Sequence, residues 1–317
     1  MKNIYSNILN VNKNSITKAI NYLNNNKLVG VPTETVYGLS GNAYSNLAIK
    51  KIYSIKKRPK HNPLIIHYYD IKKLSFDAHL DKVFFKLYQK FCPGPITFVL
   101  KKKAFSKVSK LATSNLKTIA VRFPKNKVIR NILKTTNFPL AIPSANKSSG
   151  ISPVSAIDVI EEFGNKIKII LDGGNCKIGI ESTVVDLTSS VKILRLGAIS
   201  PEKIGIVLNK KIKFIKQKKI KSPGGIKKHY SPGIPMLLNQ KKASEDGAFI
   251  TFGKRFKSKY NYFNLSKDSN LNQAAKNLYK ILRIIKKRKF KKIYVIKISQ
   301  KGIGAAINDR LEHAAAK

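Results

Sequence analysis

Strand-like and helix-like segments alternate along residues 1–209, and this alternation constrains the fold more than any other feature. Short apolar, β-branched runs are separated by segments with apolar residues at helical spacing. The strand-like runs are KLVGVP, PLIIHYY, ITFVL, TIAVRF, FPLAIP, IKIILDGG, STVVDL and VKILRLG. Helices are expected over SNLAIKKIYSIKK, DKVFFKLYQKF, SAIDVIEEF and SPEKIGIVL. Many strands with interleaved helices predict an α/β domain.

The composition changes after residue 209. Residues 210–221, KKIKFIKQKKIK, are lysine-rich, and SPGGIKKHYSPGIP then follows with many Pro and Gly residues. This composition is typical of a linker. Further on, GAFITFG, LNQAAKNLYKILRII, KKIYVIKI and GIGAAINDRLEHAA predict a small Rossmann-like βαβα unit. We therefore expect a core domain over 1–209, a linker or lid over 210–235 and a small α/β domain over 236–317.

The charge balance is strongly basic. The chain has 62 Lys plus Arg against 16 Asp plus Glu, a formal net charge of +46. Such a field attracts polyanions, nucleic acids among them. However, lysine, asparagine and isoleucine are abundant throughout, as an AT-rich genome would produce without selection for binding. Charge alone therefore leaves both interpretations open.

The sequence favours a reducing, cytoplasmic setting without a membrane segment. Cys92 and Cys176 are the only cysteines and form no CxxC pattern, so neither a zinc site nor a disulfide framework is indicated. No run of about 18 apolar residues occurs, and the first residues lack a signal-peptide core.

Three segments combine polar residues with strand ends. VPTETVYGLSGNA is expected to run from a strand through a turn to a helix near Ser45, a place where α/β proteins bind ligands. In IKKRP, Lys56 lies in the last helical turn and Pro59 directs Arg58 out of the helix. These cations could share one anion, or simply favour the helix dipole by about 0.3–1 kcal/mol each. AIPSANKSSGISP could form a polar cradle before a helix near Pro153, or be an ordinary loop.

Arg122 is unusual because it lies within the apolar run TIAVRFP. A charge inside an apolar strand is costly unless it is paired or binds a ligand. Arg122 is therefore either an edge or surface residue, or a clamp for a carboxylate.

The motifs PTETVYGL, IKxRP with NPLIIH, PGPIT, AVRFP, PSANxS, ESTVVD and SPGxxxxHYSP occur in this order. Together they resemble the threonylcarbamoyl-AMP synthase family, with its YrdC-type core and the carboxy-terminal extension of the longer form. One departure is Lys57, which stands where glycine is usual before the arginine.

The resemblance implies a twisted, open, mixed α/β sheet around a positively lined cavity. It implies a nucleotidyltransferase that condenses L-threonine, bicarbonate or CO2, and ATP with Mg²⁺ into threonylcarbamoyl-AMP and pyrophosphate. The product would pass to the tRNA threonylcarbamoyl transferase complex, for modification of adenosine 37 in tRNAs that read ANN codons. Weak tRNA binding is a further expectation, whereas a membrane is not.

The resemblance also assigns site residues. The implied threonine ligands are Thr35, His67, Arg122 and Ser182, with Arg122 on the carboxylate. The implied ATP ligands are Arg58, Asn62, Thr118, Ser144, Asn146, Ser152, Arg195 and Tyr230. Lys56 and Arg58 would neutralise the triphosphate as the catalytic cations, with Mg²⁺ carried by ATP rather than by dedicated protein ligands. The HYSP segment would act as a lid.

Two alternatives stay open beside this interpretation. One is an RNA-binding module of the same fold without adenylate synthesis, which the charge and the segment KKRKFKK would favour. The other is a different carbamoyl or adenylyl transferase on the same fold. Neither the order of substrate binding nor the purpose of the extension can be read from the sequence.

Overall fold

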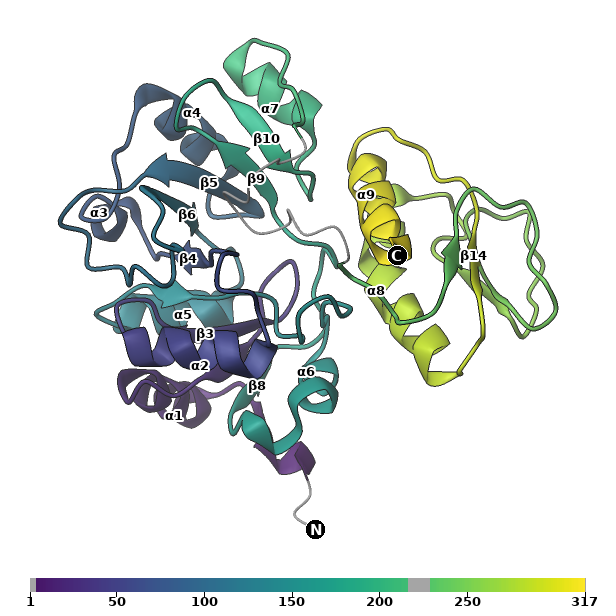
Figure 1. Ribbon diagram of the computed structural model, residues 1–317, viewed down its shortest axis with the longest axis horizontal. Coiled ribbons are helices and arrows are strands. Elements are labelled where there is room, and N and C mark those ends of the chain that lie inside the picture. The colour runs from purple at the N-terminus through teal and green to yellow at the C-terminus, as the bar shows by residue number, and fades with distance from the viewer. Residues whose placement is uncertain (1–3, 216–228, 317) are drawn as a thin grey trace.

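Two separate sheets organise the protein (Figure 1). The computed structural model describes residues 4–215 and 229–316, so residues 216–228 of the expected linker lie outside the described residues. The large sheet is mixed, with the order β1-β8-β2-β3-β7-β4-β6-β5-β9-β10. The small sheet has the order β11-β14-β12-β13, and all its pairs are parallel. Both parts of the predicted fold class are confirmed.

The elements follow the chain as a core and then an extension. The core strands are β1 (Ile8–Asn10), β2 (Val29–Val31), β3 (Gly38–Asn42), β4 (Ile65–His67), β5 (Ile96–Lys101), β6 (Thr118–Arg122), β7 (Leu140–Ala141), β8 (Ile170–Asp172), β9 (Thr183–Asp186) and β10 (Lys192–Arg195). The core helices are η1 (Ile4–Asn7), α1 (Lys13–Asn24), α2 (Asn46–Lys56), α3 (Ile71–Leu74), α4 (Lys82–Phe91), α5 (Lys127–Thr135), α6 (Ala156–Phe163), η2 (Gly164–Lys166) and α7 (Pro201–Leu208). The extension contains β11 (Met236–Leu237), β12 (Ala248–Thr251), β13 (Tyr262–Asn264), α8 (Leu271–Lys287), β14 (Ile293–Val295) and α9 (Ile303–Ala315).

The segment after Pro32 differs from the expectation of a strand, a turn and a helix. An additional strand, β3, lies between the turn and α2 and pairs antiparallel with β2 and β7. Glycine at position 38 lets β3 lie this close to the chain around Ile142, since a Cβ on Gly38 would lie 2.1 Å from the Ile142 side chain. The helix α2 begins next to Ser45, as expected, and Ser45 caps it by accepting a hydrogen bond from the Ala48 amide. The polar turn therefore joins two strands of the sheet.

The register of the central strands determines where the site forms. His67 of β4 pairs with Arg122 of β6, and Arg122 pairs with Thr97 of β5. Because side chains alternate between the two faces of a strand, Arg122, Ala120 and Thr118 share one face of β6. Arg122 lies in an interior strand and is 4% exposed, so its interpretation as an edge or surface residue was wrong.

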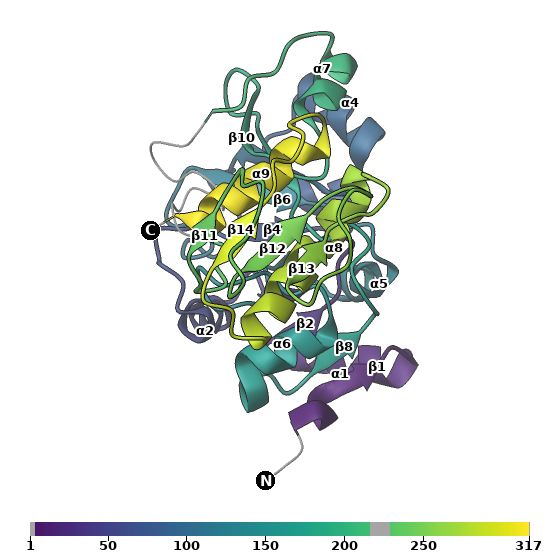
Figure 2. The same ribbon diagram turned by 90° about the vertical axis from the view of Figure 1, so that its right-hand side faces the viewer.

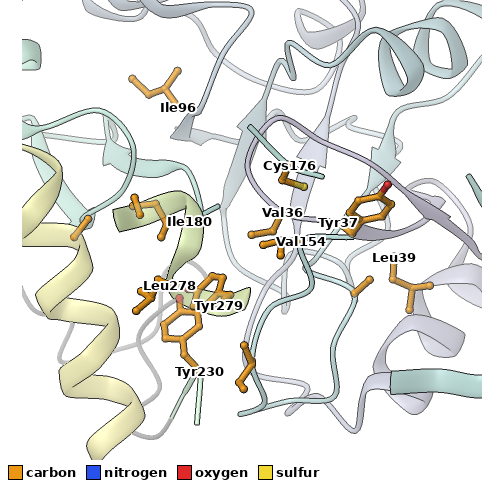
Figure 3. Packing of buried hydrophobic residues seen from close by; sticks show 14 of the residues in the cluster. Val36, Tyr37, Leu39, Ile96, Val154, Cys176, Ile180, Tyr230, Leu278 and Tyr279 are labelled. Atoms are coloured by element: carbon orange, nitrogen blue, oxygen red, sulfur yellow. The ribbon is translucent and has the colours of Figure 1, made fainter. Parts of the chain in front are cut away.

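The extension packs its helices against the core. Helices α8 and α9 lie between the small sheet and the core, as Figures 1 and 2 show together. Ile180 of the core and Leu278 of α8 belong to one hydrophobic cluster that also includes Tyr230 and Tyr279 (Figure 3). The apolar interior is therefore continuous from the core into the extension.

Two further observations concern the described part of the chain. None of the helices within residues 4–215 and 229–316 has the length and apolar character needed to cross a bilayer. Cys92 and Cys176 both carry free thiols, and burial raises the pKa of each. The β11 and β13 strands were not predicted, because neither forms a long apolar run in the sequence.

Candidate functional site

One face of the central strands carries an apolar surface, here called the apolar floor, that ends in polar side chains. Ile65, Ala120 and Leu194 belong to a small hydrophobic cluster apart from the main core, and each is slightly exposed. Two residues further along β4 and β6, the same face continues with His67 and Arg122. Such a surface offers an apolar seat for a flat group beside hydrogen-bonding residues.

A cavity lies over this face and collects residues from distant parts of the sequence. It is lined by Thr35, Val36, Arg58, Asn62, Ile65, His67, Arg122, Ile142, Pro143, Ser144, Glu181, Ser182, Arg195, His229 and Tyr230. All four predicted threonine ligands are among them. Of the other predicted residues, Lys56, Thr118, Asn146 and Ser152 do not line the cavity.

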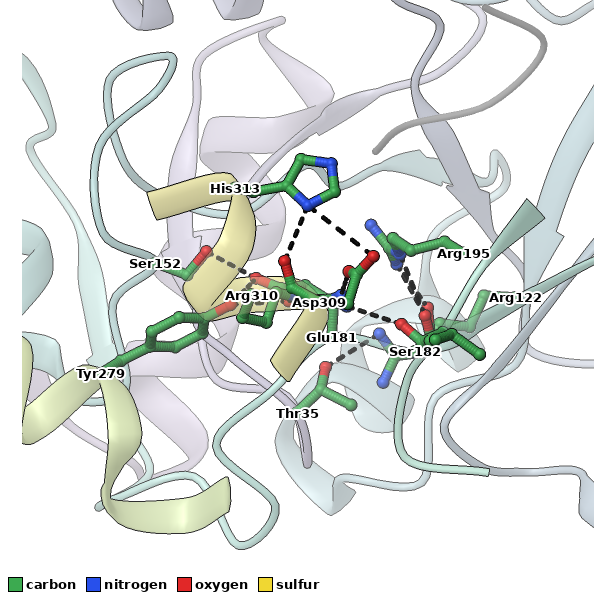
Figure 4. A network of polar contacts seen from close by, with 11 residues as sticks. Thr35, Arg122, Ser152, Glu181, Ser182, Arg195, Tyr279, Asp309, Arg310 and His313 are labelled. Atoms are coloured by element: carbon green, nitrogen blue, oxygen red, sulfur yellow. Dashed lines mark hydrogen bonds and ion pairs between the residues drawn. The ribbon is translucent and has the colours of Figure 1, made fainter. Parts of the chain in front are cut away.

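Arg122 lies at the polar end of the cavity. Its Nη2 pairs with Glu34 Oε1 at 2.6 Å, and its Nη1 donates to Thr35 Oγ1 at 3.0 Å (Figure 4). Its Nε is buried and has no hydrogen-bond partner among the described residues. Buried donors are almost always satisfied, so an unpaired guanidinium N–H beside a cavity indicates a ligand with an acceptor.

His67 lies next to Arg122 and is a neutral imidazole. Burial and the Arg122 charge lower the pKa of His67 well below its usual value. Its Nδ1 lies 3.2 Å from the Ile65 carbonyl oxygen. A carbonyl oxygen can only accept, so Nδ1 carries the proton and Nε2 is the acceptor of the ring.

Lys56 and Arg58 are both engaged by the protein itself. The Lys56 ammonium donates to the carbonyl oxygens of Ser144, at 2.5 Å, and of Asn146. Burial lowers the pKa of Lys56 well below its usual value. Arg58 donates to the backbone and side-chain oxygens of Asn62 and to Pro63 O. Lys56 thus fixes the turn after β7, while Arg58 borders the cavity.

The remaining predicted ATP ligands surround the cavity at different depths. Ser152 donates to Glu181 Oε1 at 2.7 Å, directly behind the lining. Asn146 Oδ1 is buried and unpaired in the described part of the chain. Thr118 begins β6, on the same face as Arg122 but beyond the apolar floor. These three residues are therefore near the site without bordering its present space.

Arg195 and Ser182 line the cavity together with Arg58. Arg195 donates to the Ser182 carbonyl from Nε, at 3.1 Å, and from Nη2, at 2.9 Å. Its Nη2 also lies 3.1 Å from Ser182 Oγ, which is 2.8 Å from Thr97 Oγ1. Ser182 therefore links the cationic wall to the sheet.

Tyr230 and His229 close the cavity from outside the core sheet. Tyr230 is buried and has a left-handed backbone (φ 63°), which is rare for a bulky residue and common at functional sites. The Ser231 amide fixes this segment by donating to Ser149 O at 2.9 Å. Burial lowers the pKa of His229 to about 3, with Arg58 and Lys56 also disfavouring its protonation.

Sequence reasoning missed two residues of the site, Glu34 and Glu181, and it included His229 only as part of the HYSP segment. Glu34 and Glu181 lie in quoted motifs, PTETVYGL and ESTVVD, but were given no role. A usable signal existed, because only 16 acidic residues occur in this chain and each acidic residue inside an apolar motif requires a partner.

Comparison with known proteins agrees with this geometry. A family model described as telomere recombination, covering Sua5, YciO and YrdC proteins, matches residues 21–197. A second model, described as the C-terminal domain of threonylcarbamoyl-AMP synthase, matches residues 199–316. The threonylcarbamoyl-AMP synthase of Pyrococcus abyssi is 34% identical over 319 residues, with 93% of this chain and 92% of the relative covered. The chain belongs to the threonylcarbamoyl-AMP synthase family.

Other members of the threonylcarbamoyl-AMP synthase family extend this result. The Bacillus subtilis relative is 32% identical, with 97% of this chain and 94% of its own length covered. A crystal structure of P. abyssi Sua5 complexed with L-threonine has a TM-score of 0.89 to this chain at 32% identity, with 97% of each chain covered. The similarity thus includes both the core and the extension.

Proposed function

We propose that this protein synthesises threonylcarbamoyl-AMP from L-threonine, bicarbonate or CO2, and ATP, with release of pyrophosphate. The observation that carries the proposal is the buried Nε of Arg122, which has no hydrogen-bond partner in the described part of the chain and lies beside Thr35, His67 and Ser182. A threonine carboxylate would accept from this N–H, and the hydroxyl and imidazole groups would contact the rest of the amino acid. The similar Sua5 structure with L-threonine supports this assignment.

ATP would occupy the remainder of the cavity. Its adenine would lie on the apolar floor of Ile65, Ala120 and Leu194, with Thr118 at the far end. Its phosphates would lie between Arg58 and Arg195, which border the cavity and have no ion pair with an acidic side chain among the described residues. Ser144, Asn146 and Ser152 would contact the nucleotide from the loop after β7, a loop that Lys56 holds in place.

The chemistry needs no protein nucleophile. The threonine amine and bicarbonate form a carbamate and water, and a carbamate oxygen then attacks the α-phosphorus of ATP. The new P–O bond replaces the bond to pyrophosphate, which departs with its electron pair. Arg58 and Arg195 stabilise the charge that develops on the phosphates, and Arg122 holds the threonine in line. Neutral His67 accepts a hydrogen bond rather than carrying a charge.

Mg²⁺ would enter bound to ATP and neutralise the phosphate oxygens. Within the described residues, no group of three or more His, Cys, Asp or Glu side chains could hold a metal. We therefore treat Mg²⁺ as part of the substrate.

The cavity has too little space for the substrates as it stands. Its free volume is about 50 Å³, whereas ligand pockets typically measure ~300–1,000 Å³. His229 and Tyr230 occupy one side of it, so we propose that this side moves outward when ATP binds and then covers the product. Such a cover would protect an acyl-adenylate from water.

The decisive experiment measures product formation. The protein is incubated with Mg-ATP, bicarbonate and each amino acid in turn, and the adenylate is detected by mass spectrometry together with pyrophosphate. We expect formation of threonylcarbamoyl-AMP with L-threonine and little pyrophosphate with serine or valine. Equal pyrophosphate release with all amino acids would contradict the proposal.

We further propose that the product is passed, in the cytoplasm, to the complex that transfers threonylcarbamoyl to adenosine 37 of tRNA. The net charge of +46 would support weak, salt-dependent tRNA binding beside synthesis. It also favours the alternative of a pure RNA-binding module. That alternative predicts steeply salt-dependent tRNA binding with no threonine-dependent pyrophosphate release.

A further inference from the structure

The Glu181 carboxylate lies where the core, the extension and the cavity meet. It is buried and accepts hydrogen bonds from both domains (Figure 4). From the core, Ser152 Oγ donates at 2.7 Å. From the extension, Tyr279 Oη lies 2.9 Å from Oε2 and 3.1 Å from Oε1, and Arg310 Nε donates to Oε2 at 2.8 Å. Glu181 therefore couples a predicted ATP ligand to helices α8 and α9.

Arg310 of α9 is the centre of this arrangement and is only 1% exposed. Its three guanidinium nitrogens are all used: Nε by Glu181, Nη1 by Asp309, and Nη2 by the Leu196 carbonyl oxygen at 2.8 Å. The guanidinium carbon also lies 4.9 Å from the centre of the Tyr230 ring. Because each nitrogen donates to a different acceptor, the planar guanidinium is held in one orientation.

Tyr230 contacts the same two extension residues that hold Glu181. Its ring stacks on Tyr279, with centroids 5.6 Å apart and planes 22° apart, while Arg310 lies over it. The His229 amide donates to His313 O of α9 at 3.2 Å. The side chains that cover the cavity thus rest on the extension, while the next residue, Ser231, binds the core through Ser149 O.

Stability is a poor explanation for this buried ion pair. Replacement of a buried pair by packed apolar residues is often neutral or stabilising, because both ions lose their hydration. The contacts of the Glu181–Arg310 pair instead lead to Ser152 and Tyr230, on two sides of the proposed nucleotide site. Burial would raise the pKa of the Glu181 carboxyl, but Arg310 and Arg195 lower it to about 2, so the pair is ionised.

We propose that Arg310 is a positioning residue for ATP: it fixes Glu181, which orients the Ser152 hydroxyl, and it holds the Tyr230 ring against the cavity. This inference rests on the proposed function only in taking ATP as the ligand. It gives the extension domain a role, since α9 completes a nucleotide site that the core sheet begins.

Arg283 supplies a matched control. It also lies in the extension, on α8, and also binds the core, through Ile151 O at 2.7 Å and the carboxylates of Asp158 and Glu162 at 3.6 and 3.9 Å. Among the described residues, Arg283 forms no hydrogen bond or ion pair with Glu181 or Tyr230. Arg283→Met therefore weakens domain docking without removing the support of these two residues.

The test measures the Kd for Mg-ATP by equilibrium dialysis on the full chain, together with KM for ATP and for L-threonine. We expect Arg310→Met to raise both Kd and KM for ATP about tenfold or more. KM for L-threonine should change less than about threefold, and Arg283→Met should change Kd for ATP less than about threefold. Equal effects of the two variants on ATP, or none from Arg310→Met, would overturn the inference.

A second variant keeps the test valid if Arg310→Met does not fold, because Glu181 is then buried without its counterion. Glu181→Gln/Arg310→Met removes both charges and should fold while Kd for ATP stays raised about tenfold. Recovery of wild-type ATP affinity in this double variant would overturn the inference. If the wild type forms no threonylcarbamoyl-AMP but Arg310→Met still selectively weakens ATP binding, the proposed function fails and the inference stands.

Discussion

Gly179 of the core touches the backbone of Lys276 in α8, since a Cβ at Gly179 would lie 2.5 Å from the Lys276 Cα. The glycine also has φ +84°, which side chains disfavour. Gly179→Ala must therefore move α8 or strain the loop. We expect a loss of about 2–4 kcal/mol in the free energy of unfolding, measured by urea denaturation.

Gly174 is the control for this prediction. It also has a positive φ, +73°, but a Cβ there would meet nothing within 4 Å. Gly174→Ala should therefore lower the free energy of unfolding by only about 1 kcal/mol, the cost of placing a side chain at a positive φ. Similar losses for both variants would show that the close approach to α8 is unimportant.

Arg122→Met should raise KM for L-threonine much more than KM for ATP. Removal of one partner of a buried charge pair costs about 2–5 kcal/mol, so we expect KM for L-threonine to rise roughly 100-fold. KM for ATP should stay within about threefold, since the proposed ATP seat is elsewhere on the sheet face. The variant Glu34→Gln/Arg122→Met, which leaves no unpaired Glu34 carboxylate, controls for misfolding. A proportional rise in both KM values would remove Arg122 from its assigned role.

His67 makes stability depend on pH. The pKa of His67 is lowered well below 6.5, so the unfolded chain takes up a proton that the folded protein does not bind. Stability is therefore complete above pH 6.5 and falls as the pH decreases, by about 1.4 kcal/mol per pH unit for this residue. Between pH 6.5 and 5, the wild type should lose about 2 kcal/mol more than His67→Gln in urea unfolding. From pH 7 to 8 the two should have equal slopes, and a common slope below 6.5 would contradict the prediction.

Lys57 occupies a position that suits glycine. It ends α2 with φ 50° and ψ 42°, the left-handed conformation, and is exposed. Glycine adopts this conformation without strain, which fits the glycine that the family resemblance implies at this point. Lys57→Gly should raise the free energy of unfolding by about 1 kcal/mol, because the left-handed strain disappears. Lys60→Gly, at an exposed position outside the left-handed region, should give no such gain.

Removal of metal should affect activity without affecting the free protein. EDTA should abolish adenylate formation, and excess Mg²⁺ should restore it. The unfolding temperature without nucleotide should change by less than about 1 °C, because a metal that binds only ATP does not stabilise the free protein. A clear fall in the unfolding temperature would indicate a resident metal.

Local patterns predicted the centre of the core sheet. The strands β4, β5 and β6 are apolar runs, with Pro63 just before β4 and Pro95 just before β5, and each lies close to its expected position. The strand β3 has the sequence GLSGN and was missed, because its fit depends on Ile142 packing over Gly38 rather than on an apolar run. A glycine chosen for close approach has no signature in a single sequence.

The motifs that contribute to the site could be predicted from the sequence, but the hydrogen bonds and ion pairs that connect them could not. The expected threonine residues do meet at one cavity, and two of them, His67 and Arg122, end the adjacent strands β4 and β6. The exit at Pro59 places Arg58 at the cavity edge, as expected. The pairing of Glu181 with Arg310 could not be predicted, because it depends on how the extension docks and no local pattern encodes that.

The separation of Glu181 and Arg310 along the chain has a consequence for synthesis on the ribosome. The two residues are 129 positions apart. At ~5–20 residues per second, Arg310 is made roughly 6 to 26 seconds after Glu181. A lone carboxylate is costly to bury, so the nascent core must leave Glu181 hydrated during this interval. The last part of the proposed nucleotide site therefore assembles only once α9 has been translated.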